Sequence, residues 1–499
     1  MFQGVLSFNP PLQPAIRKFA LLFCASLLFH VAGSGSLPLI DRDEPRFAEA
    51  SREMIERADY VVPFFNNRYR FDKPPLTYWA QIASYRVFGE NDFAARFPSA
   101  IAAALTAVLL FAWGRRIGPE RMAWWAAIIF TLCFQTFVHA KAAVADMWLV
   151  LFVTAAHWAG YELLRDRLPG LTSTESAGAK PERRWWWIFY LALALAFLAK
   201  GPIGWTPLLA IAATKFFLSE TKLNARFLFF TGIALVLSIV ALWGVPALIR
   251  TNGDFLRVGI GHHVLTRSFG VLEGHGTRSV WTYLAMLPFY FVVIFLTFFP
   301  WAFSLPWLAR KLWRKRDPLD NYLIVGAAVI FLVFTLVKTK LPHYTLPAFP
   351  LLALLLAKAL LDFPGAERFV RRRALLTLAL AGAAVLATPL VARLTASRAL
   401  EREAGADVTP EMEWGAGLYR EPSLVWYFRK HTKRWLAYLR DYEIKPFMEM
   451  PGPRFVVVTA DVAHRDFPQP PPDWKIYRAH GVSMTEGGRV DVVLLLKPK

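Results

Sequence analysis

The stretch DRDEPRFAEASREMIERADYVVPFFNNRYRFDKPP, residues 41–75, decides the fold of this chain. It places acids, arginines and a Lys-Pro-Pro corner between a hydrophobic run that ends near Leu39 and another that begins near Pro98. The 499 residues are 56% hydrophobic and only 19% charged, with a mean hydropathy of +0.35, which is too apolar for a soluble protein of this length. The sequence therefore predicts a polytopic α-helical membrane protein, in which this stretch is a loop between two spans.

The hydrophobic runs predict the number of spans. A helix needs about 20 predominantly apolar residues to cross a bilayer, and by that measure we expect about 11 transmembrane helices. The first run has no convincing signal-peptide cleavage site at its end, so we expect it to be retained as a span. The runs lie at residues 16–38, 98–117, 122–140, 142–163, 185–199, 202–219, 226–249, 280–306, 321–338, 342–361 and 374–395.

Short clusters of lysine and arginine alternate with mixed polar connections along the chain. Placing the amino terminus inside puts the basic clusters on the cytoplasmic side, as the positive-inside rule requires. These clusters account for the net charge of +20, so no nucleic-acid partner is expected. A transporter or flippase would carry more ionisable groups within its spans. The remaining connections emerge on the outer side and carry acids, histidines and lysines; they are residues 41–75, 139–146, 200–202, 251–279 and 338–344.

The chain is predicted to have two domains. Residues 1–396 form the transmembrane domain, with a first outer loop at 38–97 and a mobile, glycine-rich outer loop at 251–279. Residues 397–499 form a small α/β domain on the outer side. In it, PSLVWYFRKHTKRWLAYL is expected to be helical, whereas RFVVVTA and VDVVLLLKP have the β-branched composition of strands.

Two interfacial helices are predicted in the first outer loop. One begins around Asp43, which is available as its N-cap, and the other begins after Pro75 and ends near Gly89. Asp43 and Arg46 are neighbours on the first helix, so one interpretation of Asp43 is simply a cap paired with an arginine. The apolar residues of this helix recur at helical spacing and leave its charged residues on the other face; they are Phe47, Ala50, Met54 and Ala58.

The same segments resemble a known family. DRDEPRFAEASREM and the following DYVVPFFNNRYRFDKPPLTYWAQIASYRVFGENDFAARFPS resemble the first outer loop of the bacterial aminoarabinose (lipid A) transferases, relatives of the protein O-mannosyltransferases in the GT-C superfamily. KTKLPHYTLPAFPLLALLLA, residues 338–357, resembles a later outer motif of the same family. With AKGP at 199–202 and KAAVADMWL at 141–149, the similarity extends over residues 15–360.

The resemblance implies an inverting, polyprenyl-phosphate-sugar-dependent glycosyltransferase of GT-C-like fold in the bacterial inner membrane, with its active site facing the periplasm. It would move aminoarabinose, a related amino sugar or a hexose from undecaprenyl phosphate to lipid A or another envelope acceptor, and so contribute to polymyxin resistance. We expect a monomer without a cofactor. Protein O-glycosylation of the mannosyltransferase type is the alternative, and transport of a lipid-linked substrate is a third.

Three residues are predicted to be catalytic. Asp43 matches the essential carboxylate of the family and would act as a general base toward a hydroxyl acceptor, or as an orienting group toward a phosphate acceptor. Lys73 and Arg46 would stabilise the negative charge that develops on the departing lipid phosphate. Two prolines stiffen the backbone that presents Lys73, although a lysine at a membrane interface also commonly snorkels.

Further residues are expected to bind substrate. Asp146 stands at the outer end of an apolar run, with Lys141 or Arg46 as its expected partner. No metal is expected, because the histidines of the glycine-rich loop follow no metal-binding pattern. The predicted substrate-binding residues are Asp146, Lys200, Arg257, Lys338, Lys340, His343 and Tyr344, and the loop histidines are His262, His263 and His275.

Overall fold

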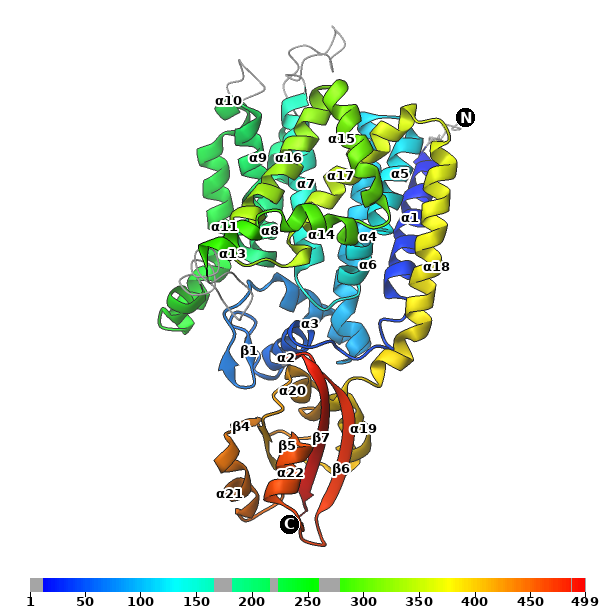
Figure 1. Cartoon of the computed structure of the whole chain (residues 1–499). Helices are drawn as coiled ribbons and strands as arrows, with labels where there is room; N and C mark the ends of the chain where they lie inside the picture. The colour runs from blue at the N-terminus through cyan, green and yellow to red at the C-terminus, as the bar shows by residue number, and fades with distance from the viewer. Residues whose placement is uncertain (1–11, 166–181, 216–222, 260–278, 486, 499) are drawn as a thin grey trace, which may run out of the picture.

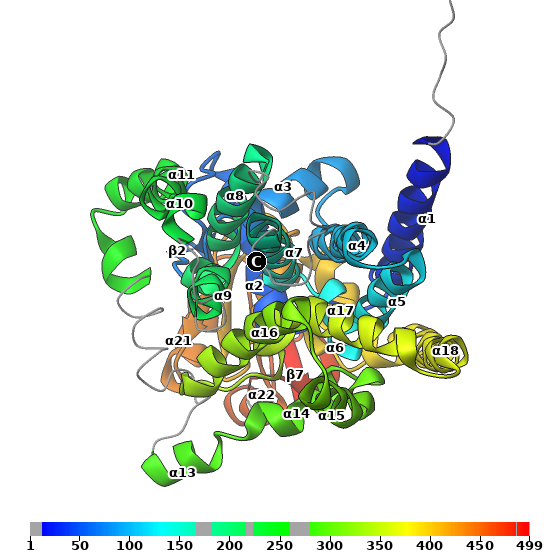
Figure 2. The same ribbon diagram turned by 90° about the horizontal axis from the view of Figure 1, so that it is seen from above.

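The computed structural model describes residues 12–165, 182–215, 223–259, 279–485 and 487–498. A bundle of long helices stands on a small α/β domain, and α2 and α3 lie at the junction between the two (Figure 1). Seen along the bundle, α1 and α18 lie at one edge and α11 at the opposite one (Figure 2). The predicted polytopic helical protein with a carboxy-terminal α/β domain is therefore confirmed.

The helices of the bundle follow the hydrophobic runs of the sequence. Several end in short 3-10 segments, of which Gly201–Trp205 and Pro342–Ala348 bear on the site. The helices are α1 (Leu12–Val31), α4 (Asp92–Ile117), α5 (Glu120–Thr131), α6 (Phe134–Ala140), α7 (Asp146–Leu164), α8 (Arg183–Lys200), α9 (Thr206–Thr214), α10 (Leu223–Phe227), α11 (Phe229–Arg250), α13 (Val280–Ala285), α14 (Phe289–Thr297), α15 (Leu305–Arg314), α16 (Pro318–Leu336), α17 (Phe349–Ala359) and α18 (Ala366–Ala392).

The predicted total of eleven spans is not confirmed. Within the described residues, seven helical runs are long and apolar enough to cross a membrane, or up to nine if each of two bent helix pairs is one span. The pairs are α5 with α6, bent by 64°, and α14 with residues 301–314, bent by 118°. The difference arises because α1 is not among these runs and because residues 183–214 count as a single run.

That single run is nevertheless two helices. Gly201 has a φ of 77°, which ends α8, and the chain then turns back. A Cβ on Gly204 would lie 2.6 Å from the carbonyl carbon of Ala196, eight residues earlier, whereas a continuous helix would separate these positions by about 12 Å. Figure 2 accordingly shows α8 and α9 as separate helices seen end-on. The reversal puts Lys200 at the outer end of the bundle.

The first outer loop folds into two helices and a short hairpin. The helices are α2 (Asp43–Glu56) and α3 (Leu76–Phe88), and the hairpin strands are β1 (Phe64–Phe65) and β2 (Arg68–Tyr69). Both helix starts agree with the sequence prediction, but Arg42 rather than Asp43 occupies the N-cap position, and no side-chain cap is formed there. Ala58 lies beyond the end of α2, with a φ of 51°, so it does not extend the apolar face.

The carboxy-terminal domain is a five-stranded sheet in the order β4-β3-β5-β7-β6, with helices on both faces. β3 runs parallel to β4 and β5, whereas β7 is antiparallel to both β5 and β6. Its elements are α19 (Ala396–Ala404), β3 (Glu413–Gly417), α20 (Pro422–Phe428), β4 (Ala437–Leu439), α21 (Ile444–Glu449), β5 (Arg454–Thr459), α22 (Ala460–Asp466), β6 (Lys475–Ser483) and β7 (Gly488–Lys497).

Two of the three secondary-structure predictions for this domain are confirmed. RFVVVTA and VDVVLLLKP supply β5 and β7. The third is wrong, because the helix expected over residues 422–439 stops at Phe428 and residues 437–439 form β4 instead. Leu439 packs against Ile444 and Val456 on one face of the sheet, and this tertiary contact outweighs the local helical pattern.

The charged face of α2 is buried against this domain. Glu49 forms an ion pair with Arg52 and a second one with Arg429, and Arg52 also donates to the carbonyl oxygen of Trp426 at 3.1 Å. Asn66 exchanges two hydrogen bonds of 2.9 Å with the backbone of Leu436. The sequence placed the charged residues of this helix on one face, and α20 and its neighbours cover that face, which fixes α2 between the two domains.

Candidate active site

A polar cavity of about 510 Å³ opens where the first outer loop, the outer ends of the bundle helices and the carboxy-terminal domain meet. Its lining comes from six separate segments of the chain and includes acids, arginines, lysines and histidines. These residues are Asp41, Arg42, Asp43, Arg46, Phe47, Arg70, Asp72, Lys73, His139, Ala142, Val144, Ala145, Asp146, Lys200, Leu341, His343, Tyr344, Met484, Thr485 and Gly487.

The first turn of α2 presents Asp43 and Arg46 to this cavity. The turn is anchored by its next residue, Glu44, whose carboxylate accepts two hydrogen bonds from the guanidinium of Arg96, at 2.8 and 2.7 Å. The same carboxylate accepts the backbone N–H groups of Ile40 and Ala143, both at 2.7 Å. Glu44 thus ties α2, α4 and the segment before α7 together, and it fixes where Asp43 lies.

The corner before α3 presents Lys73. Arg70 forms an ion pair of 3.0 Å with Asp72 and donates to the Tyr78 hydroxyl at 3.1 Å, and its guanidinium lies 5.2 Å from the centre of the Phe47 ring. These contacts join the corner to both α2 and α3. Lys73 donates to the carbonyl oxygen of Asp72 at 3.0 Å and lines the cavity. The backbone of the corner is therefore held on both sides of the lysine.

The bundle helices contribute an ion pair to the cavity, between Asp146 at the start of α7 and Lys200 at the end of α8. The Lys200 ammonium lies 2.6 Å from the Asp146 carboxylate, and the two side chains are only 14% and 10% exposed. Asp146 therefore pairs with Lys200, and the expected pairing with Lys141 or Arg46 is wrong. Lys141 instead donates to carbonyl oxygens at the end of α1, including that of His30 at 2.9 Å. The reversal after α8 is what brings Lys200 to the start of α7.

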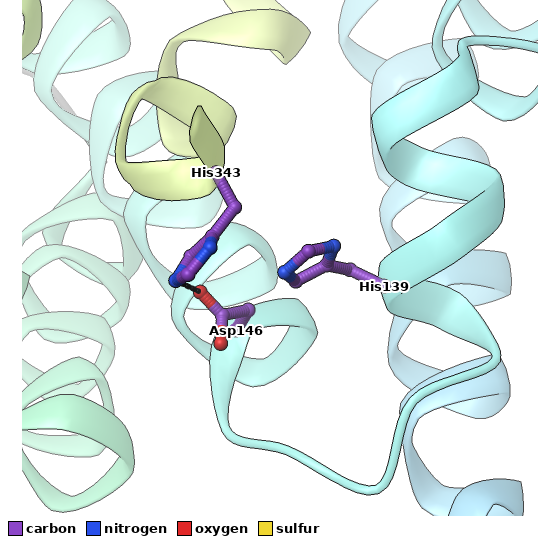
Figure 3. Close-up of side chains that lie close together, drawn as sticks. All are labelled: His139, Asp146 and His343. Carbon is purple, nitrogen blue, oxygen red and sulfur yellow. Dashed lines mark ion pairs between the residues drawn. The ribbon is translucent and has the colours of Figure 1, made fainter. Parts of the chain in front are cut away.

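Two histidines flank this ion pair. His343 approaches the Asp146 carboxylate to 3.8 Å, and the His139 and His343 rings lie 4.7 Å apart (Figure 3). Each of these three residues offers one ligand atom, and the three atoms lie within 4.8 Å of one another, a spacing that a metal ion could use. The ammonium of Lys200 already neutralises the carboxylate of this group. The loop histidines His262, His263 and His275 lie outside the described residues.

An apolar groove of about 500 Å³ adjoins the polar cavity. It runs between α9 and α16, and Asp72, Lys73, Lys200 and Tyr344 line both spaces. Beyond these shared residues its walls are almost entirely hydrophobic. They are formed by Pro202, Ile203, Trp205, Thr206, Leu208, Leu209, Val333, Phe334, Val337 and Thr339. A molecule with a charged head and a long apolar tail would therefore fit with the head beside the lysines and the tail in the groove.

Seven of the ten predicted site residues line the cavity; they are Asp43, Arg46, Lys73, Asp146, Lys200, His343 and Tyr344. The structure does not bring the other three into its lining. Lys340 donates to the carbonyl oxygens of Phe334 and Val337 and thereby caps α16. Arg257 forms an ion pair with Asp254 and is 80% exposed. Lys338 is half-buried, and most of the predicted mobile loop, residues 260–278, lies outside the described part of the chain.

Sequence analysis missed several lining residues. Arg70 and Asp72 stand within the quoted loop, and their proximity to Lys73 could have suggested them. His139 precedes Asp146 in an outer connection, which was a second available signal. Met484 and Thr485 come from the turn between β6 and β7, more than 400 residues from Asp43, and no local pattern links them to the site.

Asp41 lies at the edge of the cavity, where its carboxylate accepts the backbone N–H of Ser423 at 2.8 Å. Burial is the main cause that raises the pKa of Asp41 to about 7; the charge of Glu421 adds to this effect, whereas the bond from Ser423 opposes it. Burial, followed by the charge of Glu49, likewise raises the pKa of Glu53 to about 7. Both carboxyl groups thus take up protons more readily in the folded chain than in the unfolded one.

This difference predicts a pH dependence of stability. An unfolded aspartate ionises near pH 3.9, so between about pH 4 and pH 7 the unfolded chain binds fewer protons than the folded one and stability falls as pH rises. The change in the thermal unfolding temperature in detergent between pH 5.5 and pH 7.5 includes this contribution of Asp41. In Asp41→Asn the unfolding temperature should therefore fall less, or rise more, between these two pH values than in the wild type, whereas Asp441→Asn, at an exposed ion pair with Arg465, should behave like the wild type. The same change in Asp41→Asn as in the wild type would contradict the assignment.

The comparisons with known proteins agree with this architecture. A family profile for dolichyl-phosphate-mannose-protein mannosyltransferases matches residues 33–257. Two undecaprenyl phosphate-alpha-4-amino-4-deoxy-L-arabinose arabinosyl transferases are similar to the chain. The one from Aeromonas salmonicida is 31% identical over 76% of this chain and 66% of its own length. The one from Edwardsiella ictaluri is 30% identical over 68% of this chain and 60% of its own length.

A solved structure is similar over nearly the whole chain. It is the crystal structure of ArnT from Cupriavidus metallidurans bound to undecaprenyl phosphate, which covers 96% of this chain and 98% of its own, with a TM-score of 0.75 and 19% identity. The fold is that of a multi-pass membrane protein with a charged cavity, and it resembles the fold of this transferase. In sequence the chain is similar to the bacterial aminoarabinose transferases, and part of it matches the profile of the protein mannosyltransferases. The chain spans less than two thirds of the length of either of these two curated relatives.

Proposed function

We propose that this chain is an integral membrane glycosyltransferase that moves aminoarabinose, or a related sugar, from undecaprenyl phosphate to lipid A. The observation that carries this proposal is the contact between the polar cavity and the apolar groove at Lys73 and Lys200. A polyprenyl phosphate has the matching shape and charge, because its head is anionic and its tail is a hydrocarbon. The names of the similar transferases support the same donor.

The chemistry proposed for the cavity is an inverting displacement at the anomeric carbon of the sugar. The acceptor oxygen attacks this carbon, the bond between the carbon and the phosphate oxygen breaks, and the electron pair of that bond leaves with undecaprenyl phosphate. Lys73 would stabilise the growing negative charge, with Arg46 as a second cation, because fixed charges in a poorly solvated site are effective at this task. Asp43 would accept the proton of a hydroxyl acceptor, or orient the donor if the acceptor is already an anionic phosphate.

The proposed setting is the bacterial inner membrane, with the cavity on the periplasmic side and the chain acting as a monomer. Basic residues support this orientation. Arg115 and Arg116 end α4 at the end of the bundle that is opposite the cavity, as expected for a cytoplasmic face (Figure 1). With an amino sugar as the donor, transfer to a lipid A phosphate would offset negative surface charge and weaken the binding of polymyxin.

We further propose that the reaction needs no metal ion. A cation near Asp146 is already provided by the Lys200 ammonium at 2.6 Å, which lies beside both neighbouring histidines. Transfer by the purified protein should therefore be unchanged by EDTA. The variant Lys200→Met removes that ammonium and should make the group of His139, Asp146 and His343 available to Zn²⁺, which calorimetry would detect. Loss of transfer on chelation, with recovery on adding a divalent metal, would contradict this proposal.

The proposed function is tested by mass spectrometry of lipid A from cells with the gene, without it and with Asp43→Asn. The expected result is a mass addition of one pentose-sized amino sugar or one hexosamine that is lost in the deletion strain and in the variant. Immunoblots should show that the variant protein is present at the wild-type level. Lipid A of identical mass in all three strains would rule out lipid A as the acceptor.

One observation favours a second candidate. The profile that matches residues 33–257 describes transferases that act on proteins, so a periplasmic protein is the alternative acceptor. This candidate predicts sugar on serine or threonine residues of envelope proteins, together with unmodified lipid A. Glycoproteomics of the same strains separates the two candidates, since only one of the two products should depend on the chain.

A further inference from the structure

The turn between β6 and β7 reaches from the carboxy-terminal domain into the polar cavity. Met484, Thr485 and Gly487 line the cavity together with the start of α2. They are not among the residues that line the apolar groove, whereas Lys73 and Lys200 line both spaces. Figure 1 shows the two strands rising from the α/β domain to the level of α2, below the helices that form the groove. The turn thus belongs to the part of the cavity wall that the groove does not share.

A buried carboxylate holds this turn in place. Glu421 is 1% exposed and accepts three hydrogen bonds from the turn. The Ser483 hydroxyl donates at 2.7 Å, the Thr485 backbone N–H at 3.0 Å and the Thr485 hydroxyl at 2.7 Å. Hydrogen bonds to an ionised acceptor are stronger than those between neutral groups, so this carboxylate is a firm anchor.

The anchor is itself tied to the first outer loop. Glu421 directly precedes α20, and the backbone N–H of Ser423 in the first turn of that helix donates to Asp41. The Trp426 indole N–H and the Tyr427 hydroxyl of α20 both donate to Asp92 at the start of α4, at 2.7 and 3.0 Å. The turn therefore keeps a defined position relative to α2, even though it belongs to the other domain.

We propose that the β6–β7 turn forms the acceptor-side wall of the cavity, that Met484 contacts the acceptor, and that Glu421 is the residue that positions this wall. The inference rests on the proposed function. If the groove admits the lipid tail of the donor, the part of the cavity wall that the groove does not share is available to the acceptor, and the turn belongs to that part. The Met484 side chain is 52% exposed, and a flexible, polarisable thioether suits the apolar faces of a glycolipid.

The test uses the full-length protein in nanodiscs, with undecaprenyl-phosphate aminoarabinose as donor and purified lipid A as acceptor, each varied at a fixed concentration of the other. Glu421→Ala and Met484→Asp should each raise the KM for lipid A by about tenfold, the scale expected for losing apolar contact in a pocket. The KM for the donor should stay within about twofold, since the groove is intact. Glu421→Gln retains one acceptor oxygen and should restore part of the loss.

Glu413→Ala is the matched control, because Glu413 lies in the same domain and forms an exposed ion pair with Arg434 at 3.3 Å. It should leave both KM values unchanged. Met484→Asp alters a half-exposed side chain, so it remains informative if Glu421→Ala fails to fold. Equal changes in the KM for donor and acceptor, or an unchanged KM for lipid A in Met484→Asp, would overturn the inference.

A second readout keeps this inference separate from the proposed function. A photoreactive phenylalanine analogue at position 484 should cross-link biotinylated lipid A whether or not turnover occurs, and unlabelled lipid A should compete. A wild-type protein that fails to transfer sugar to lipid A would contradict the proposed function. The absence of cross-linking from position 484 in a protein that does transfer would contradict only the assignment of the wall.

Discussion

Replacing Lys73 by methionine should lower the rate of sugar transfer by about 10²–10³-fold, the usual cost of removing one preorganised group that stabilises charge in a transition state. Methionine has a similar length and keeps the packing, but it has no charge for the departing phosphate. Lys73→Arg should recover part of the rate, because it restores the charge with a different geometry. The measurement is single-turnover transfer of radiolabelled sugar by the purified protein.

The matched control for this experiment is Lys475→Met. Lys475 lies in the carboxy-terminal domain, where it forms an ion pair with Asp407 and is 51% exposed. The variant Lys475→Met should leave the rate unchanged. If Lys73→Met transferred sugar at the wild-type rate, Lys73 would be a snorkelling residue at the membrane interface, and Lys200 would become the leading candidate for stabilising the phosphate.

The second large effect is expected on stability, for Glu44→Gln. The Arg96 guanidinium is buried with 1% of its side chain exposed, and Glu44 is its carboxylate partner. Glutamine removes the compensating charge and replaces one acceptor oxygen by an NH2 group, which would face groups that themselves donate. Removing one partner of a buried ion pair typically costs about 3–5 kcal/mol, so the free energy of unfolding should fall by that amount.

Denaturant unfolding of the protein in mixed micelles, followed by tryptophan fluorescence, would measure this loss. Glu120→Gln is the control. Both side chains of the Glu120–Lys18 ion pair are exposed, so this substitution should leave the unfolding curve unchanged. Circular dichroism should show Glu44→Gln with native helix content before denaturation. If Glu44→Gln gave the same unfolding curve as the wild type, water would have to solvate the charge of Arg96 in place of the lost carboxylate.

The sequence predicted the elements that a local pattern can specify. The starts of α2 and α3 follow from an acid-proline and a Lys-Pro-Pro signal, and both are where they were expected. Seven of the ten predicted site residues meet in one cavity, because the topology deduced from the basic clusters places their connections on a single side. Hydrophobicity and charge asymmetry were sufficient for that much.

What the sequence could not give depends on contacts between distant segments. Helical periodicity shows that Glu49 and Arg52 share a polar face, but not that Arg429, almost 380 residues later, covers it. The partner of Asp146 depends on the chain reversal at Gly201, which brings Lys200 to the start of α7. The wall formed by Met484 depends on how a whole domain docks. None of these three long-range contacts produces a periodic or compositional pattern in the sequence.

The shared lining of the cavity and the groove has a kinetic consequence. If a carrier lipid occupies both, its tail never has to leave the bilayer, and the spent carrier departs sideways between α9 and α16 into the surrounding leaflet. Encounter with the next carrier is then a two-dimensional search. Turnover should accordingly follow the mole fraction of carrier in the membrane rather than its amount per volume of solution, so diluting the carrier with inert phospholipid should slow the protein even when the total quantity of carrier is constant.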